Sequence, residues 1–284
     1  MTTALPRLTA LYVPGSRPDR FAKAVWTGAQ VVILDLEDSV APDDKVAART
    51  AVEKWVLAPH SADSTVVQVR VNSLSSAWAL DDLAMVARLA KAGPVELRLS
   101  KTETVEQVDA AFGIVGPGVP VIALIETALA LENCREIASH PAVAGLALGD
   151  SDLAGDLGSS SDAVLDWARI RLLVASRASM LAAPMMSVFP NIADLNGLES
   201  DTRRGRDLGL VGRTAVHPSQ LPAIVRAFTP ETERLAWARE VQAALTASEG
   251  GVCRLASGEM VDAAMGDQAR SLLALAEAAA TFPT

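Results

Sequence analysis

The sequence predicts an α/β protein of the TIM (β/α)8 barrel type with a C-terminal helical lid extension. Eight short apolar runs recur along the 284 residues, helix-length stretches separate them, and polar residues follow the end of nearly every run. Strands that alternate with helices form parallel sheets, and eight such units close a TIM barrel. Barrel enzymes carry out their chemistry at the carboxyl ends of the strands, so the pattern also indicates an enzyme.

The predicted strands have the continuous apolar character of strands that are buried on both faces. They span residues 8–13, 31–36, 65–71, 95–99, 119–125, 143–148, 185–189 and 212–216. An open doubly wound sheet is the alternative, but a dinucleotide-binding glycine loop would follow a strand, and the segment GIVGPG precedes one. We expect a catalytic barrel over residues 1–228 and a helical extension with a lid segment over residues 229–284.

Composition restricts the classes of partner. The net charge of −9 disfavours nucleic acids and anionic membranes, although a local cationic pocket could bind a small anionic substrate. Cys134 and Cys253 match neither a metal-ligand spacing nor a disulfide framework, and the N-terminus lacks a signal segment. No apolar stretch reaches the roughly 20 residues that a membrane-spanning helix needs. We therefore expect a cytoplasmic protein with no nucleic-acid or membrane partner.

Basic residues follow the first predicted strand. Arg17 and Lys23 come after a Pro-Gly turn, at the start of a predicted helix. Backbone N–H groups and the helix dipole favour an anion such as a phosphate at this position. Solvated side chains on a helix surface are the common alternative.

Acids and a buried arginine follow the next two strands. Asp35, Glu37 and Asp38 end the second run, and alternation places Asp35 and Glu37 on one face. Acids at a buried strand end need a partner or a cation. Arg70 lies between valines of the third run, so it must contact a carboxylate or a ligand. A structural salt bridge from Arg70 to Asp35 or Glu37 is the alternative to a functional role.

The fourth run also has charged residues at its end, Arg98 and Lys101. Two acids follow the central strands. Glu126 comes directly after the run VPVIALI, and Asp152 comes just after VAGLALG. Adjacent strand ends lie side by side in a barrel, so Glu126 and Asp152 should converge. Oxygen ligands suit Mg²⁺ and leave positions for water and substrate. Capping of the following helices is the alternative for either acid.

Seven ordered stretches resemble the citrate lyase β-subunit-like group of the HpcH/HpaI aldolase superfamily, and the resemblance covers nearly the whole chain. The matching stretches are VPGSRPDRFAKA (13–24), VILDLEDSVAPDDK (32–45), VRVN (69–72), ALIET (123–127), GDSDLAGDLG (149–158), VFPNIADLNGL (188–198) and TAVHPSQL (214–221). The resemblance implies a TIM barrel, usually trimeric, that binds Mg²⁺ and cleaves or forms C–C bonds in 3-hydroxyacyl thioesters such as citryl-, malyl- or citramalyl-CoA. We expect a homotrimer or a hexamer.

The resemblance also implies roles for individual residues. By matching position, Glu126 and Asp152 would hold Mg²⁺, and Arg70 would polarise the substrate carbonyl. Asp35 or Glu37 would contact the metal through waters. Arg17, Lys23 and Lys101 are the residues that we expect to bind CoA.

The C-terminal segment GEMVDAAMGDQARSLLALA (258–276) is similar to the family's lid motif. Its acid, Asp262, would reach a neighbouring subunit's active site as an acid or base. Ser151, Ser100 and Ala263 depart from the residues that are common in the family, which leaves the acyl substrate and the lid geometry open. Capping of the final helix is the alternative role for Asp262.

These observations predict a Mg²⁺-dependent carbon–carbon lyase that converts a 3-hydroxyacyl-CoA thioester into an acyl-CoA and a 2-keto acid. A hydroxyacyl-CoA thioesterase could use the same groups. Two further alternatives are an aldolase that acts on free hydroxy-keto acids, and a subunit of a citrate lyase complex that acts on an acyl carrier protein.

Overall fold

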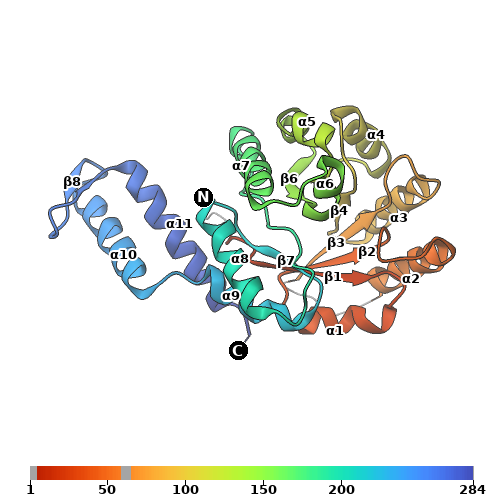
Figure 1. Cartoon of the computed structure of the whole chain (residues 1–284), viewed down its shortest axis with the longest axis horizontal. Coiled ribbons are helices and arrows are strands. Elements are labelled where there is room, and N and C mark those ends of the chain that lie inside the picture. Colours follow the sequence, from red (N-terminus) through yellow and green to blue (C-terminus); the bar gives the residue numbers. More distant parts are fainter. Residues whose placement is uncertain (1–4, 59–64, 284) are drawn as a thin grey trace.

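A curled parallel sheet forms the centre of the computed structural model, which describes residues 5–58 and 65–283. Seven strands follow the order β6-β5-β4-β3-β2-β1-β7, with helices in an arc around them (Figure 1). The strands are β1 (Thr9–Pro14), β2 (Val31–Asp35), β3 (Val66–Val71), β4 (Glu96–Leu99), β5 (Val121–Ile125), β6 (Val143–Leu148) and β7 (Arg213–Ala215). All neighbours in this sheet pair in parallel. The prediction of a TIM-barrel-like α/β fold is confirmed.

Helices connect the successive strands. They are α1 (Phe21–Trp26), α2 (Lys45–Leu57), α3 (Ala79–Ala92), α4 (Val105–Val115), α5 (Ala128–Ser139), α6 (Asp150–Leu157), α7 (Asp162–Ala178), α8 (Leu195–Asp207) and α9 (Leu221–Phe228), with the short 3-10 helices η1 (Pro18–Arg20), η2 (Pro42–Asp44) and η3 (Pro218–Gln220). The side chain of Thr127 caps α5 by accepting a hydrogen bond from the Ala130 N–H. Because the helix begins immediately there, Glu126 stays at the end of β5.

The strand register gathers charged side chains at one end of the sheet. Asp35 at the end of β2 is paired with Arg70 on β3, and Arg70 is paired with Arg98 on β4. The strands around them are buried, with every residue of β2 inside the core. Since the carboxyl ends of parallel strands meet at one end of a barrel, three neighbouring strands present their charges to the same space.

The predicted strand over residues 185–189 is not a strand in the structure. Single parallel bridges join Met185 to Ala147 of β6 and Met186 to Arg213 of β7. Only these bridges connect the two edges of the sheet within the described residues. The barrel circuit is therefore completed by a short irregular segment, and the prediction of eight regular strands is wrong at this position.

The sequence around this segment explains the difference. Prolines at positions 184 and 190 flank it, and proline has no N–H to donate to a ladder. Regular pairing is confined to Met186, whose N–H donates to the Gly212 carbonyl and whose carbonyl accepts from the Thr214 N–H. Two further polar groups of the segment have side-chain or loop partners. Ser187 Oγ accepts a hydrogen bond from the Asp150 N–H at 3.2 Å, and the Phe189 carbonyl accepts one from Gln220 Nε2 at 2.9 Å. These contacts tie the segment to the loops at the cavity end of the sheet.

The C-terminal part contains α10 (Thr232–Ala247), the antiparallel pair β8 (Cys253–Arg254) and β9 (Met260–Val261), and α11 (Ala263–Ala280). It has a hydrophobic cluster of its own, which includes Val241, Leu245 and Val261. The other end of α11 joins the main core through Ala278. Figure 1 shows α10 and β8 projecting to one side of the barrel. The domain division between residues 228 and 229 stays a prediction.

The described residues also bear on membrane spans and on cysteine chemistry. None of their helices combines the length and the apolar character that crossing a bilayer requires. Cys134 and Cys253 are free thiols.

Candidate active site

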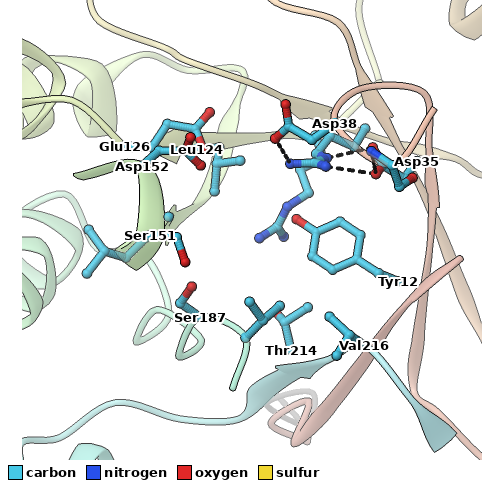
Figure 2. Close-up of a pocket in the computed structure, with 16 residues that line it drawn as sticks. Tyr12, Asp35, Asp38, Leu124, Glu126, Ser151, Asp152, Ser187, Thr214 and Val216 are labelled. Atoms are coloured by element: carbon cyan, nitrogen blue, oxygen red, sulfur yellow. Dashed lines mark hydrogen bonds and ion pairs between the residues drawn. The ribbon is translucent and has the colours of Figure 1, made fainter. Parts of the chain in front are cut away.

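A cavity of about 380 Å³ opens at the carboxyl ends of the strands (Figure 2). Side chains from β1 to β7 and from the irregular segment after β6 contribute to its wall. The lining residues are Tyr12, Asp35, Asp38, Ser39, Arg70, Arg98, Leu124, Glu126, Leu148, Gly149, Ser151, Asp152, Ser187, Val188, Thr214 and Val216. The sequence-predicted residues Asp35, Arg70, Glu126 and Asp152 therefore share one cavity.

Arg70 is the cation of a buried cluster of acids. Its Nε and Nη2 donate hydrogen bonds to the two carboxylate oxygens of Asp35, at 2.6 and 2.7 Å. Its Nη1 lies 2.9 Å from Glu37 Oε2 and 3.4 Å from Asp38 Oδ2. The salt bridge that the sequence left as an alternative is thus present with both Asp35 and Glu37. Arg70 nevertheless still lines the cavity, so the ion pairs do not remove it from the site.

The cluster shifts the ionisation of its members in opposite directions. Burial opposes the charge of Asp35, but the hydrogen bonds from Arg70 outweigh it, and the pKa of Asp35 is lowered. Burial also opposes the charge of Arg70, but its hydrogen bonds to Asp35 hold the pKa of Arg70 well above its usual range. Burial dominates at Glu37 and raises the pKa of that carboxyl group. Asp35 and Arg70 are therefore a charged pair under all ordinary conditions.

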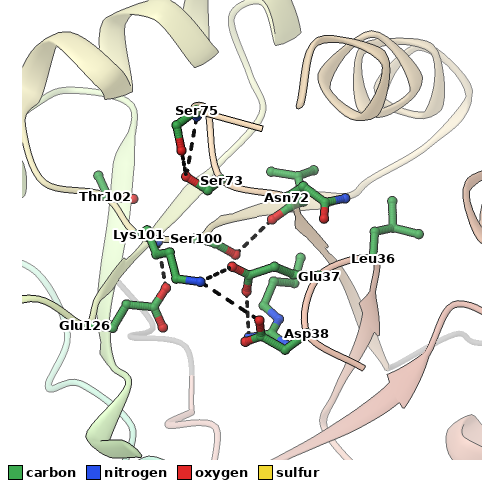
Figure 3. A network of polar contacts seen from close by, with 12 residues as sticks. Leu36, Glu37, Asp38, Asn72, Ser73, Ser75, Ser100, Lys101, Thr102 and Glu126 are labelled. Atoms are coloured by element: carbon green, nitrogen blue, oxygen red, sulfur yellow. Dashed lines mark hydrogen bonds and ion pairs between the residues drawn. The ribbon is translucent and has the colours of Figure 1, made fainter. Parts of the chain in front are cut away.

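Lys101 links this cluster to Glu126 (Figure 3). Its Nζ lies 3.1 Å from Glu37 Oε1, and its backbone N–H donates to Glu126 Oε1 at 2.7 Å. The backbone of Lys101 has φ of 48°, in the left-handed region, so the turn after β4 is bent to aim this N–H at Glu126. One residue therefore holds acids from two different strand ends.

Glu126 and Asp152 converge as predicted. Burial, the nearby charge of Glu37 and the charge of Asp152 together raise the pKa of Glu126 to about 7. Glu126 is buried, whereas Asp152 is exposed in the first turn of α6. Gly149 makes room for this arrangement, because a Cβ atom there would lie 2.6 Å from Glu126 Oε2. The close approach of the β6 end to Glu126 thus requires glycine.

The donors of this pair fit a hard divalent cation such as Mg²⁺. Both are carboxylates, and the raised pKa of Glu126 reflects burial and negative charge that a cation would offset. Across residues 5–58 and 65–283, no three Asp, Glu, His or Cys side chains are grouped so that they alone could hold a metal ion. Glu126 and Asp152 would supply two ligands and leave the other positions to water and substrate, which is usual for Mg²⁺.

The comparisons with known proteins agree with this geometry. The model of the HpcH/HpaI aldolase/citrate lyase family matches residues 8–218. The chain belongs to this family. A (3S)-malyl-CoA thioesterase from Cereibacter sphaeroides is 34% identical over 286 residues, which cover 98% of each chain. A citrate lyase subunit beta-like protein from Mycobacterium tuberculosis is 37% identical over 272 residues, which cover 93% of each chain.

A crystal structure in the same family has the same fold over nearly the whole chain. CitE from Mycobacterium tuberculosis, in complex with magnesium, acetoacetate and coenzyme A, matches with a TM-score of 0.79 and 33% identity. The match covers 98% of this chain and 100% of that one. The HpcH/HpaI family includes lyases and, by the name of the Cereibacter relative, a thioesterase.

Five predicted residues of this HpcH/HpaI family member do not line the cavity. Glu37 and Lys101 contact the lining residues Arg70 and Glu126 from behind, whereas Arg17, Lys23 and Asp262 make no such contact with the wall in the described part of the chain. The exposed Arg17 binds Asp19 through two hydrogen bonds of 2.9 and 2.8 Å, and Lys23 lies on the following helix, α1. Asp262 is the N-cap of α11, where its side chain accepts a hydrogen bond from the Met265 N–H. The capping role is therefore present, and among the residues that the structure describes Asp262 is not part of the cavity lining.

Sequence reasoning did not assign functions to two residues that shape the site, Tyr12 and Lys45. Tyr12 lines the cavity, and the guanidinium carbons of Arg70 and Arg98 lie over its ring, at 4.9 and 5.6 Å from the ring centroid. Lys45 Nζ donates to the carbonyls of residues 36 and 37, at 2.8 and 2.6 Å, and so fixes the turn that carries Glu37. A tyrosine within an apolar run is typical of core packing, so its position gave no signal of function. Lys45 ends the matched stretch 32–45, which was the available signal for its role.

Proposed function

We propose that this HpcH/HpaI family member is a Mg²⁺-dependent carbon–carbon lyase that cleaves a 3-hydroxyacyl-CoA thioester into an acyl-CoA and a 2-keto acid. The observation that carries the proposal is the convergence, in one cavity, of two carboxylates suited to Mg²⁺ and one buried arginine. The family supplies the reaction class, since its members include citrate lyase β-like proteins.

Glu126 and Asp152 are the residues that would hold the metal. When it is bound, Mg²⁺ supplies Lewis-acid polarisation and orientation of the substrate oxygens. The backbone N–H of Lys101 orients the Glu126 carboxylate, and Gly149 leaves the space that this carboxylate needs. These two contacts fix one metal ligand before the substrate arrives.

Arg70 is our candidate for stabilising negative charge on the thioester oxygen. Cleavage next to a thioester forms an enolate, and a fixed cation beside that oxygen lowers the barrier, as an oxyanion hole does. Asp35 engages Arg70 through both of its oxygens, so we assign to Asp35 the role of orienting the guanidinium group. Glu37 contacts both Arg70 and Lys101, and we assign it to the same support, with a water-mediated contact to the metal.

Asp262 is our candidate for the group that transfers a proton at the acyl carbon. It lies on the C-terminal extension, so the proposal requires that it act in a neighbouring barrel of a homotrimer or hexamer. A carboxylate covered by a second subunit has the burial that raises a pKa towards the working pH.

Arg17, Lys23 and Lys101 are proposed to bind the CoA phosphates. Replacement of Arg17 and Lys23 by alanine should raise KM for CoA esters and weaken its dependence on salt, since exposed charges are screened over about 10 Å at 0.1 M salt. An unchanged KM and salt dependence would assign both residues to the solvated surface.

A thioesterase is the second candidate function, because the 34% identical Cereibacter relative is named a (3S)-malyl-CoA thioesterase. The same site would then split the thioester with an activated water. The two reactions leave different products from one substrate, so they can be separated by direct assay.

The deciding experiment is a turnover screen of purified protein with Mg²⁺ against citryl-, malyl- and citramalyl-CoA. A lyase produces keto acid and acyl-CoA in equal amounts without free thiol, whereas a thioesterase produces free thiol and hydroxy acid. Asp152→Asn should reduce turnover and Mg²⁺ affinity while the fold is kept, and Asp156→Asn, also on α6 but outside the cavity lining, is the matched control. Equal Mg²⁺ titrations of wild type and Asp152→Asn would refute the metal site.

A further inference from the structure

Arg98 is a buried cation that faces the cavity without an acidic partner. Its exposed fraction is 4%, and it lines the cavity wall. Within the described part of the chain, its side chain makes one hydrogen bond, from Nη1 to Gln68 Oε1 at 3.3 Å, and its Nε has no acceptor. Its remaining close contact is the face of the Tyr12 ring.

The neighbouring arginine, Arg70, differs from Arg98 in having acidic partners. Arg70 lies opposite Arg98 on the adjacent strand and is paired with three carboxylates. Glu96, two residues before Arg98 on β4, is engaged elsewhere, since Arg7 and Gln68 Nε2 donate hydrogen bonds to it. The bond to Glu96 also fixes the Gln68 amide, so that only its neutral oxygen is turned to Arg98. The protein thus provides no counter-ion among these neighbours.

A guanidinium group in this state destabilises the unliganded protein. Burial of a charge is unfavourable unless the charge is paired, and unfilled hydrogen-bond donors add to that cost. An anion in the cavity would offset the cost, and the planar fork of guanidinium donors matches a carboxylate. A cavity of about 380 Å³ is within the range of small-molecule sites, so it has room for an acid that contacts both the metal ligands and Arg98.

We propose that Arg98 binds a second carboxylate of the substrate, so that the keto product is a 2-oxo dicarboxylic acid rather than a 2-oxo monocarboxylic acid. This inference rests on the proposed lyase function for the identity of the keto acid. The first carboxylate and the keto oxygen would bind to the Mg²⁺ that Glu126 and Asp152 would hold. The second carboxylate would bind to Arg98. A substrate with a methyl group in its place leaves the guanidinium group unpaired.

Equilibrium binding with Mg²⁺ tests the proposal without requiring turnover. Two matched pairs differ by one terminal carboxylate: pyruvate with oxaloacetate, and 2-oxobutyrate with 2-oxoglutarate, of which the second pair is chemically stable. Wild type should bind at least one diacid about 10- to 150-fold more tightly than its monoacid partner, which is the range for a hydrogen bond to a charged group. Arg98→Met should remove this preference and leave monoacid affinity within about twofold.

Controls separate recognition from folding. Arg98→Lys retains the charge and should retain part of the preference, and Arg88→Met is the same substitution on an exposed helix position. Thermal unfolding without ligand should show that Arg98→Met is at least as stable as wild type, because an unpaired buried charge has been removed. A diacid should raise the Tm of wild type more than that of Arg98→Met.

Three results overturn the proposal: equal binding of diacid and monoacid by wild type, equal loss of both in Arg98→Met, or no binding of any of the four acids. The turnover screen reports separately on the lyase. Diacid preference without turnover would contradict the lyase function and leave the assignment of Arg98 standing. Turnover without diacid preference would support the lyase function and contradict the assignment of Arg98.

Discussion

Glu126 is buried where its carboxylate approaches those of Glu37 and Asp152, and this environment raises its pKa. Its pKa rises from an ordinary value of 4.5 to about 7, mainly through burial and then through the charge of Glu37. Between these two pH values the folded metal-free protein holds a proton on Glu126 that the unfolded chain has released. Stability in the absence of metal is therefore lost as the pH rises through this window.

The first prediction concerns Glu126→Gln, which keeps the shape of the side chain but cannot ionise. In EDTA at pH 8, this variant should be more stable than wild type by up to about 3 kcal/mol, and at pH 4.5 the two should be alike. Urea unfolding at both pH values measures the difference. Saturating Mg²⁺ at pH 8 should favour wild type, and a stability difference that does not change with pH would contradict the shifted ionisation.

The second prediction concerns Gly149. A methyl group there would lie within 2.7 Å of two Glu126 atoms, so Gly149→Ala must move a metal ligand. We expect a loss of about 1–3 kcal/mol in stability and a weaker Mg²⁺ affinity by calorimetry. Gly155→Ala on α6 is the control, because a Cβ at this position meets nothing within 4 Å. It should be neutral or stabilising, and equal effects of both variants would contradict the packing argument.

Single residues also show what the sequence could and could not predict. Asp35, Arg70, Glu126 and Asp152 were predicted because a charge at the end of an apolar run stands out. Arg98 has the same signal, but its lack of an acidic partner is a property of three strands together and cannot be read from one run. Tyr12 lies within an apolar run, so the sequence indicates core packing at this position and not a place in the cavity wall.

At the scale of elements, continuous apolar runs predicted β1 to β6 because these strands are buried on both faces. The segment at 185–189 has the same composition, but prolines flank it and its backbone pairs with the β7 side only around Met186. Beyond that point the Phe189 carbonyl accepts from the Gln220 side chain, and the Ser187 side chain accepts from the Asp150 N–H. Hydrophobicity alone does not distinguish a strand from a segment that is buried and bonded to loops. The tertiary contacts that decide the matter come from parts of the chain about 30 residues away or more.

The third prediction tests the contact of this segment with Gln220, which is fully buried. Its Nε2 donates to the Phe189 carbonyl, and its Oε1 accepts from the N–H groups of Val216 and His217. Gln220→Ala leaves these backbone groups unsatisfied, so we expect a loss of about 1–3 kcal/mol or more in chemical denaturation. Ser219→Ala, an exposed change on the same 3-10 helix, should cost less than about 0.5 kcal/mol. Similar losses in the two variants would show that the Gln220 bonds are not needed.

At the scale of the whole molecule, α11 belongs to two hydrophobic clusters. Its first half packs with α10 and β9, and its last turn packs into the barrel core. The position of Asp262 is therefore set by the barrel through the helix that follows it. The proposed role of Asp262 in a neighbouring subunit would make the assembly the catalytic unit.

The fourth prediction is complementation between inactive subunits. Asp262→Asn should be inactive yet stable, because asparagine caps a helix as well as aspartate does. Asp152→Asn supplies the second inactive subunit, since removal of Arg70 would leave the buried Asp35 without its cation. After subunit exchange in equal amounts, about one quarter of the sites in a cyclic assembly would combine an intact barrel with an intact Asp262. Proven exchange without recovery, or a fully active Asp262→Asn protein, would contradict action between subunits.

The chain contains a single tyrosine, and that residue is Tyr12, in the cavity wall next to Arg70 and Arg98. Biosynthetic replacement by 3-fluorotyrosine would therefore place one ¹⁹F nucleus in the protein, and it would lie beside both guanidinium groups. Any acid that binds to either arginine changes the electric field at this nucleus. One resonance in a one-dimensional spectrum would then report occupancy of the site in a protein of 284 residues, without an assay and without resonance assignment.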